Sequence, residues 1–266
     1  MNVATPTHGA GELLRDWRRR RRMSQLDLGL EANVSARHIS FVETGRSKPS
    51  RELILHLAEQ LEVPLRERNV LLLAAGYAPV YDETPLDNEA MTPARAALEK
   101  ILAGHEPFPA VIVDGRWDLI SANRPAMGLL TEDVAPDLLA PPVNAMRVNF
   151  HPKGLAPRIS NLPEYSAHWL TRLQRQAALS PDPAVLELID ELRSYPGVSE
   201  PSPATVEPAE LLFVPLRIRA LGEELSFFST IATFGTALDI TLAELSIESL
   251  FPADGETDAV LRRAFG

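Results

Sequence analysis

Six arginines lie within eight positions near the start of the chain, Arg15 and the run Arg18 to Arg22. A guanidinium group binds phosphate and carboxylate oxygens through paired N–H donors, so this density of arginine suits the phosphate backbone of a nucleic acid. A solvated helix face explains the run as well, because short basic clusters are frequent. The cluster by itself leaves both interpretations open.

The sequence contains no group of residues as suggestive of catalysis or of metal binding as the arginine cluster is of phosphate binding. The sequence lacks G-x-S-x-G, a glycine-rich phosphate loop and H-E-x-x-H, and its histidines, at positions 8, 38, 56, 105, 151 and 168, have no metal-ligand spacing. Zero cysteines exclude thiol catalysis and thiolate zinc sites. No carboxylate falls in an apolar run that would raise its pKa. We therefore predict that the protein is not an enzyme and holds no metal or cofactor.

The net charge of −10 is unevenly distributed along the 266 residues. Residues 1–80 hold twelve Arg and Lys against nine Asp and Glu, or +3, whereas the remaining 186 residues hold 14 against 27, or −13. The acidic total therefore does not exclude a nucleic-acid partner for the first part of the chain.

The composition favours a cytoplasmic protein that does not enter membranes. No apolar run approaches the roughly 18 to 20 residues that cross a bilayer. The N-terminus shows no basic segment followed by an apolar one, so we expect no signal peptide, and the absence of cysteine fits a reducing compartment.

The elements that must position these residues divide the chain into three parts. Residues 1–80 have helical periodicity, residues 81–94 continue a proline-rich and acidic stretch that predicts a linker, and residues 95–266 mix period 2 with helical segments. We predict an all-α bundle of five helices followed by an α+β domain, an antiparallel sheet covered by helices.

Stop and start signals recur every ten to fifteen positions over residues 11–77. Ser24 and Ser35 are expected N-caps of the second and third helices, Asn33 is a left-handed C-terminal residue, and Gly45 ends the third helix. These two helices and their short turn predict a helix-turn-helix, which places one helix in a DNA major groove and the other across the backbone.

The second domain is expected to begin with a hairpin, continue through helices and end in three strands. The hairpin comprises residues 109–114 and 116–122, and the strands about 211–219, 225–234 and 238–250. Asn161 with Glu164 has the spacing of a capping box, and Asp182 precedes another helix. The proline-rich segment 196–208 is expected to be a surface loop.

The segment MSQLDLGLEANVSARHISFVETGRSKPS closely resembles the XRE family of Cro/C1-type helix-turn-helix regulators. In that family Ser-Gln-x-x-Leu opens the second helix and Glu-x-Gly-x-x-x-Pro closes the third. The matching positions are Ser24, Gln25, Leu28, Ser35, Ile39, Glu43, Gly45 and Pro49. The resemblance implies sequence-specific binding to double-stranded DNA.

The resemblance also implies which residues contact DNA, namely polar side chains at helix starts and the outer face of the third helix. Arg37 is expected to bridge guanine O6 and N7, and Phe41 either touches a thymine methyl or turns inward as core. Arg18 and Glu43 are expected to form a structural pair. The full set of DNA contacts is Gln25, Ser35, Ala36, Arg37, Ser40, Phe41, Arg46 and Lys48.

The remainder of the chain, about residues 95–263, looks like the ligand-binding domain of MmyB-like transcription regulators. The resemblance rests on VIVDGRWDLISANRPAMGLL, PPVNAMRVNFHPKGLAPRISNLPEYSAHWLTRLQRQA, DPAVLELIDELRSYPGV and FFSTIATFGTALDITLAELSIESLFPAD. It implies a PAS-like fold and long apolar ligands of the fatty-acid kind.

An apolar ligand needs a chamber between sheet and helices, with a polar group at its mouth. Arg147, His151 and Arg158 are candidate anchors for a carboxylate, and Asn123 is either a ligand contact or the N-cap of the following helix. The apolar candidates form either chamber walls or solid core. They are Phe108, Val111, Val113, Trp117, Met127, Leu130, Met146, Phe150, Trp169, Leu173, Phe213 and Phe227.

The sequence thus predicts a DNA-binding transcriptional regulator whose second domain senses a small apolar effector, such as a fatty acid. A homodimer on a near-palindromic operator would suit a helix-turn-helix protein. In the alternative, the second domain has a filled core and serves only for dimerisation or protein interaction.

Overall fold

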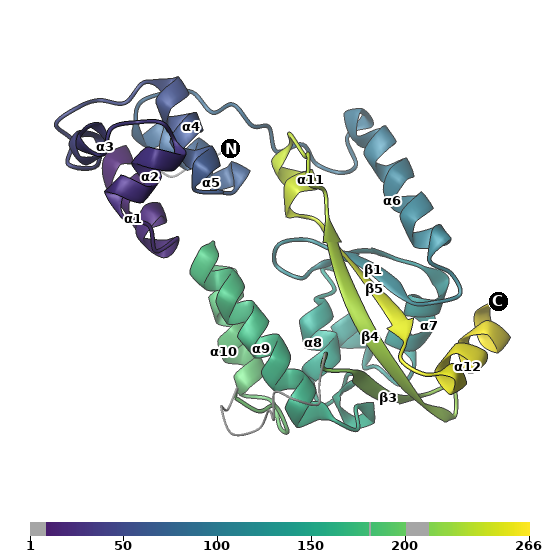
Figure 1. The fold of residues 1–266 in the computed structure, drawn as a ribbon. Helices are drawn as coiled ribbons and strands as arrows, with labels where there is room; N and C mark the ends of the chain where they lie inside the picture. The colour runs from purple at the N-terminus through teal and green to yellow at the C-terminus, as the bar shows by residue number, and fades with distance from the viewer. Residues whose placement is uncertain (1–8, 181, 201–212) are drawn as a thin grey trace. The chain divides into compact units, whose positions relative to one another are not determined.

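The structure is a computed structural model that describes residues 9–180, 182–200 and 213–266 (Figure 1). Its contacts divide the chain into two compact units. The first unit runs to Thr84 and also includes Thr236–Ala243, and the second comprises Pro85–Gly235 and Glu244–Gly266.

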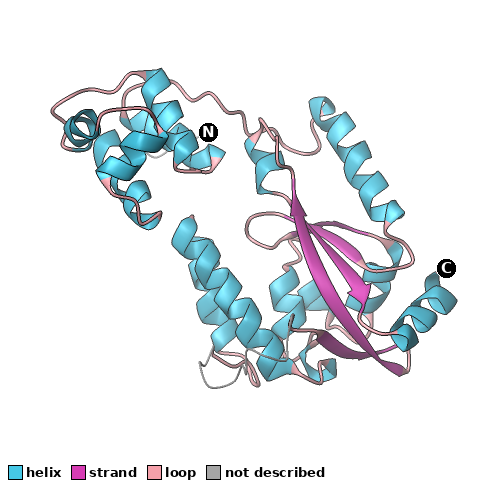
Figure 2. Cartoon of the chain, in the orientation of Figure 1, coloured by secondary structure: helices cyan, strands magenta, loops and turns pink. Residues whose placement is uncertain are grey.

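The first unit contains the five predicted helices (Figure 2). They are α1 (Ala10–Arg20), α2 (Gln25–Glu31), α3 (Ala36–Glu43), α4 (Arg51–Gln60) and α5 (Leu65–Ala74). One apolar core joins them, with Trp17, Ile39 and Leu57 among its buried members. The all-α bundle is therefore confirmed.

Local capping explains where α2 and α3 begin and end. Ser24 accepts a hydrogen bond from the backbone of Asp27, whose side chain accepts one in return, and Ser35 caps α3 through the backbone of His38. Asn33 has a φ of 52°, the left-handed conformation expected there. A Cβ at Gly29 would lie 2.6 Å from the carbonyl oxygen of Val34, so the turn packs closely on α2.

The second unit is built on a five-stranded antiparallel sheet in the order β2-β1-β5-β4-β3. Its strands are β1 (Ala110–Val113), β2 (Leu119–Ala122), β3 (Leu216–Ala220), β4 (Glu223–Thr233) and β5 (Ser246–Pro252). This is the strand order of PAS domains, so the expected PAS-like α+β fold is confirmed.

Helices pack on this sheet from several segments. They are α6 (Thr92–Gly104), α7 (Arg124–Thr131), α8 (Ala145–Phe150), α9 (Leu162–Leu179), α10 (Pro183–Arg193) and α12 (Gly255–Phe265), with short 3-10 turns η1 (Glu89–Met91), η2 (Pro136–Leu139) and η3 (Ala156–Arg158). Val111, Val113 and Phe227 face one core with side chains of α7 to α10. Ile112 points to the opposite face, because successive strand residues alternate.

The last predicted strand, 238–250, is wrong in its first half. Residues Ile240–Glu244 form the short helix α11, and β5 begins only at Ser246. The carboxylate of Asp239 accepts a hydrogen bond from the backbone N–H of Thr241, which favours a helical turn over an extended strand. Strand β4 lies close to its predicted range, whereas β3 begins only at Leu216 and the described residues 213–215 of its predicted range are not in a strand.

The structure also differs from the predictions at one helix cap and in helices that were not predicted. The capping box of Asn161 with Glu164 is not formed, because Asn161 accepts from Arg217 N–H and donates to the carbonyl oxygen of Pro215. Helices α6 and α12 have no counterpart among the predicted elements, so the second domain ends in a helix and not in the last strand. Residues 201–208 of the expected loop and residues 211 and 212 of the expected strand are outside the described residues.

Candidate functional site

Helix α3 presents its polar side chains at the surface of the first unit. Ser35, Arg37, Arg46 and Lys48 are exposed. The remaining predicted DNA contacts are partly exposed and lie on α2 and α3: Gln25, Ala36, Ser40 and Phe41. The structure therefore leaves the predicted contacts accessible.

A buried ion pair holds α3 against α1. Arg18 donates from Nε to Glu43 Oε1 over 2.6 Å and from Nη2 to Oε2 over 2.8 Å. Burial alone would raise the pKa of Glu43, but hydrogen bonds from Arg18 and Gln25 outweigh it and hold that pKa below its usual value. This is the structural pair that the resemblance implies.

Gln25 takes part in the same network. Its Nε2 donates to Glu43 Oε2 over 2.8 Å, so the amide is oriented before any DNA is bound. A primary amide has two N–H groups and an acceptor oxygen, so one N–H and the oxygen are left for a phosphate or a base.

The side chain of Phe41 is not part of the buried core, and its predicted contact with a thymine methyl stays a prediction. Its ring is only partly buried, and the guanidinium carbons of Arg37 and Arg46 lie 5.3 and 6.0 Å from the ring centroid. Cation–π contacts of this kind fix where the two arginines point. Phe41 therefore orients the predicted base-reading arginine and its neighbour.

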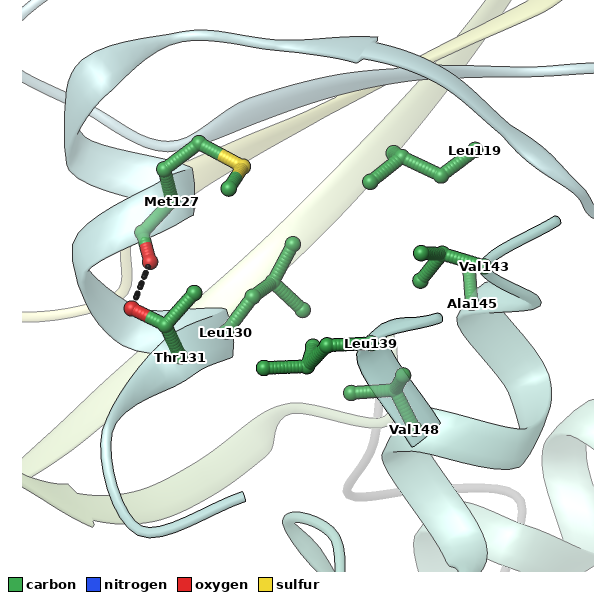
Figure 3. A pocket seen from close by; sticks show the side chains of 8 residues that line it. All are labelled: Leu119, Met127, Leu130, Thr131, Leu139, Val143, Ala145 and Val148. Atoms are coloured by element: carbon green, nitrogen blue, oxygen red, sulfur yellow. Dashed lines mark hydrogen bonds between the residues drawn. The ribbon is translucent and has the colours of Figure 1, made fainter. Parts of the chain in front are cut away.

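A small apolar cavity of about 80 Å³ lies in the second unit, between β2, α7, η2 and α8 (Figure 3). The hydroxyl of Thr131, the single polar side-chain group of the lining, donates to the carbonyl oxygen of Met127 over 2.7 Å. No charged side chain among the described residues lines the cavity. Its walls are Leu119, Met127, Leu130, Thr131, Leu139, Val143, Ala145 and Val148.

Met127 and Leu130 are the predicted wall residues that line this cavity. Phe108 is partly buried against the main core, and Phe213 is exposed, with its ring 5.4 Å from that of Phe228. The remaining predicted wall residues are packed in the core of the second unit: Val111, Val113, Trp117, Met146, Phe150, Trp169, Leu173 and Phe227.

The three predicted anchors all have partners within the protein. Arg147 binds both carboxylate oxygens of Glu191, at 2.9 to 3.0 Å. His151 Nδ1 accepts from the backbone N–H of Lys153. Arg158 donates to Glu132 Oε2 over 2.8 Å. A ligand carboxylate would have to compete with Glu191 for Arg147 and with Glu132 for Arg158.

Asn123 is the N-cap of α7 and not a free ligand contact. Its Oδ1 accepts from the backbone N–H groups of Ala110 and Ala126, and its Nδ2 donates to the carbonyl oxygens of Leu102 and Phe108. With four hydrogen bonds the amide is fully used. It joins β1, α6 and α7 beside the cavity.

A family model described as the MmyB-like transcription regulator ligand binding domain matches residues 94–264, which is more than half of the chain. The chain belongs to the MmyB-like transcription regulators. A second family model, described as a helix-turn-helix, matches residues 14–68 of this MmyB-like regulator.

None of the curated proteins matches the MmyB-like regulator. One similar solved structure, described as "Structure of an RNA-binding Light-Oxygen-Voltage Receptor", has 13% sequence identity and a TM-score of 0.24. The match covers 96% of this chain and 61% of that chain.

The described ranges of the MmyB-like regulator contain neither a candidate membrane span nor a candidate metal site. No helix there is long and apolar enough to span a membrane. In the same ranges, no group of three or more His, Asp or Glu side chains is arranged to hold a metal ion.

One buried acid does not stand out in the sequence, because Glu248 lies between Ile247 and Ser249 and not in an apolar run, and the expectation that no carboxylate has a raised pKa is wrong. Glu248 of β5 is only 6% exposed. Burial raises its pKa to about 7, while a hydrogen bond with Ser229 and the charge of Arg172 oppose the rise. Its place inside the predicted strand 238–250 was the signal that could have identified it.

Proposed function

We propose that this MmyB-like regulator binds operator DNA through α3 as a homodimer and senses a fatty-acid-like effector in its second unit. The regulator acts in the cytoplasm, by binding and not by catalysis. Effector control requires that the ligand bind one arrangement of the protein better than another.

The DNA-binding part of the proposal is supported by the outward side chains of α3. Arg37 and Arg46 are exposed and oriented by Phe41, and Ser35 is exposed at the start of the helix. The predicted base contacts are Ala36, Arg37, Ser40 and Phe41, and the predicted phosphate contacts are Gln25, Ser35, Arg46 and Lys48.

The apolar cavity beside α7 is the observation that carries the effector proposal. A cavity lined by aliphatic side chains without a charged group favours an alkyl chain over a polar metabolite. Its small volume suits the end of such a chain, with the remainder extending between Met127 and Leu139, which are both at least partly exposed.

The test is extraction and thermal melting of the full chain. Solvent extraction of purified protein should release fatty acid in stoichiometric amount. After delipidation, lauric acid at 100 times its Kd should stabilise the second unit by about 2.7 kcal/mol. The Met127→Trp variant should lose this shift because the indole fills the cavity. Leu186→Trp, which changes an exposed leucine on α10, should keep it.

A filled core serving only for dimerisation is the second candidate function. It is favoured by the large side chains that fill the core where walls were predicted, Trp117, Phe150 and Trp169 among them. A clean apo mass in native mass spectrometry, no released lipid and no melting shift with lauric acid would establish this candidate against the effector proposal.

A further inference from the structure

The arginine cluster separates into two groups in the structure. Arg18 is committed to Glu43, and Arg21 donates from Nε and Nη2 to the carbonyl oxygens of Leu61 and Glu62 at the end of α4. These two arginines hold helices together. Their guanidinium groups are therefore not the ones available to a partner.

The other arginines of α1 and its turn are oriented differently. Arg19 and Arg22 are exposed and Arg15 is half-buried. Within the described residues, none of the three forms an ion pair with a carboxylate. Arg20, in contrast, lies over the ring of Trp17, with its guanidinium carbon 4.9 Å from the centroid.

Arg15 and Arg19 share one face of α1, because residues four apart in a helix are neighbours. Gly11 lies on the same face, where a Cβ would overlap the carbonyl oxygen of Val42 in α3. The charge of Arg15 also helps to lower the pKa of Glu43. This face of α1 therefore runs beside the end of α3.

Arg22 continues the basic face beyond the helix. Its backbone N–H bonds to the carbonyl oxygen of Arg19 over 2.9 Å, and its φ of 57° turns the chain toward α2. The charge of Arg15 acts on Glu43, which lies three residues before the predicted phosphate contact Arg46 in the sequence.

We infer that Arg15, Arg19 and Arg22 form an accessory contact to DNA phosphates, which we name the α1 arginine strip. The inference rests on the proposed DNA binding by α3. Phosphate is the favoured partner because this face of α1 lies beside the end of α3, and because Arg19 and Arg22 are exposed and have no carboxylate partner among the described residues. The strip should add affinity without adding base preference.

The test is the salt dependence of DNA binding by full-length Arg19→Ala/Arg22→Ala. Fluorescence anisotropy would measure Kd for a duplex selected from a random library by the wild type and for a random duplex. Each lost phosphate contact should reduce the slope of log K against log salt by about 0.9, so the double variant should lose about 1.8. Both duplexes should weaken alike.

Three variants control this experiment. Arg175→Ala/Arg263→Ala removes the same charge from exposed positions of α9 and α12 and should leave the slope unchanged. Arg19→Lys/Arg22→Lys should restore most of the slope, because lysine keeps the charge. Arg37→Ala should change base preference, and adding Arg19→Ala/Arg22→Ala to it should still reduce the slope of log K against log salt by about 1.8. Thermal melting would show that each variant is folded.

If Arg19→Ala/Arg22→Ala has an unchanged salt slope, or if it loses affinity only for the selected duplex, the α1 arginine strip does not contact phosphates. In that outcome the wild type still binds its selected duplex, so the proposed function stands. Failure of the wild type to prefer any selected duplex would instead overturn the proposed DNA recognition itself.

Discussion

At the scale of single residues, Glu248 is the most unusual group in the second unit. It pairs across the sheet with Val111 of β1 and Ile231 of β4, and no ion pair to it is formed among the described residues. Tyr165 and Arg172 of α9 and Ser229 of β4 are its polar neighbours. Its environment therefore favours the protonated carboxyl.

Glu248 predicts a loss of stability as the pH rises. Its pKa is about 7 in the folded unit and near 4.5 in the unfolded chain, so its protonated form stabilises the fold below pH 4.5. That stability is lost between pH 4.5 and 7, by about 3 kcal/mol. Glu248→Gln should match the wild type at pH 4.5 and be more stable at pH 8.

Urea unfolding at both pH values would measure this difference. A Trp17→Phe background makes the fluorescence report on Trp117 and Trp169 in the second unit. Glu223→Gln, at an exposed position of β4, is the matched control and should show no such gain. If Glu248→Gln and its Trp17→Phe background are equally stable at pH 8, the pKa of Glu248 is not raised in the folded unit.

Arg37 carries a prediction about base preference. Arg37→Ala should cost about 1 to 3 kcal/mol on the selected duplex and relax preference at one guanine. Arg46→Ala should weaken selected and random duplexes alike. Competition binding with a set of point-mutated duplexes measures both effects. An equal loss on all duplexes for Arg37→Ala would identify it as a phosphate contact.

At the scale of elements, the first unit depends on the ion pair between α1 and α3. The side chains of Arg18 and Glu43 are only 10% and 2% exposed, so water does not solvate either charge when the other is removed. The pair holds the end of the reading helix, and Gln25 links it to α2. Three helices thus share one carboxylate.

Arg18→Met should destabilise the first unit by about 3 to 5 kcal/mol, because it leaves Glu43 buried and unpaired. Arg18→Met/Glu43→Leu should recover much of that loss, since the buried charge is gone. Thermal melting followed by the fluorescence of Trp17, in a Trp117→Phe/Trp169→Phe background, separates the cases. A double variant no more stable than the single one would show that the pair itself supplies the stability.

At the scale of the whole molecule, the chain leaves the second unit between β4 and β5 and returns to it. Residues 236–243 belong to the first unit, where the N–H of Ile240 donates to the carbonyl oxygen of Asp82 over 2.8 Å. The carboxylate of Asp239 accepts from the N–H of Thr84 over 3.1 Å. The first unit is therefore discontinuous in sequence.

Asp239→Ala should release this contact, at a cost of about 1 to 2 kcal/mol for the lost hydrogen bonds. Hydrogen exchange at the amides of Thr84 and Thr241 should accelerate, while the amides of α3 keep their protection. Asp87→Ala, an exposed residue nearby in sequence, should leave these rates unchanged. Unchanged exchange in Asp239→Ala would mean that the backbone contacts alone hold the segment.

Features that depend on neighbouring residues could be predicted from the sequence. The helix periodicity, the caps at Ser24 and Ser35, the left-handed Asn33 and the hairpin at β1 and β2 all arise from a few consecutive positions. Family motifs then added the pairing of Arg18 with Glu43, and the charge of the first 80 residues indicated which part meets DNA.

The tertiary structure decided everything that depends on distant partners. Arg147 meets Glu191, Asn161 meets Arg217 of β3, and Asp239 meets Thr84, over separations of 44, 56 and 155 residues. The same holds for the burial of Glu248 and for the cavity beside α7, because burial and empty space are set by which elements pack together. Local sequence specifies the elements, and only their packing determines which side chains remain free to act.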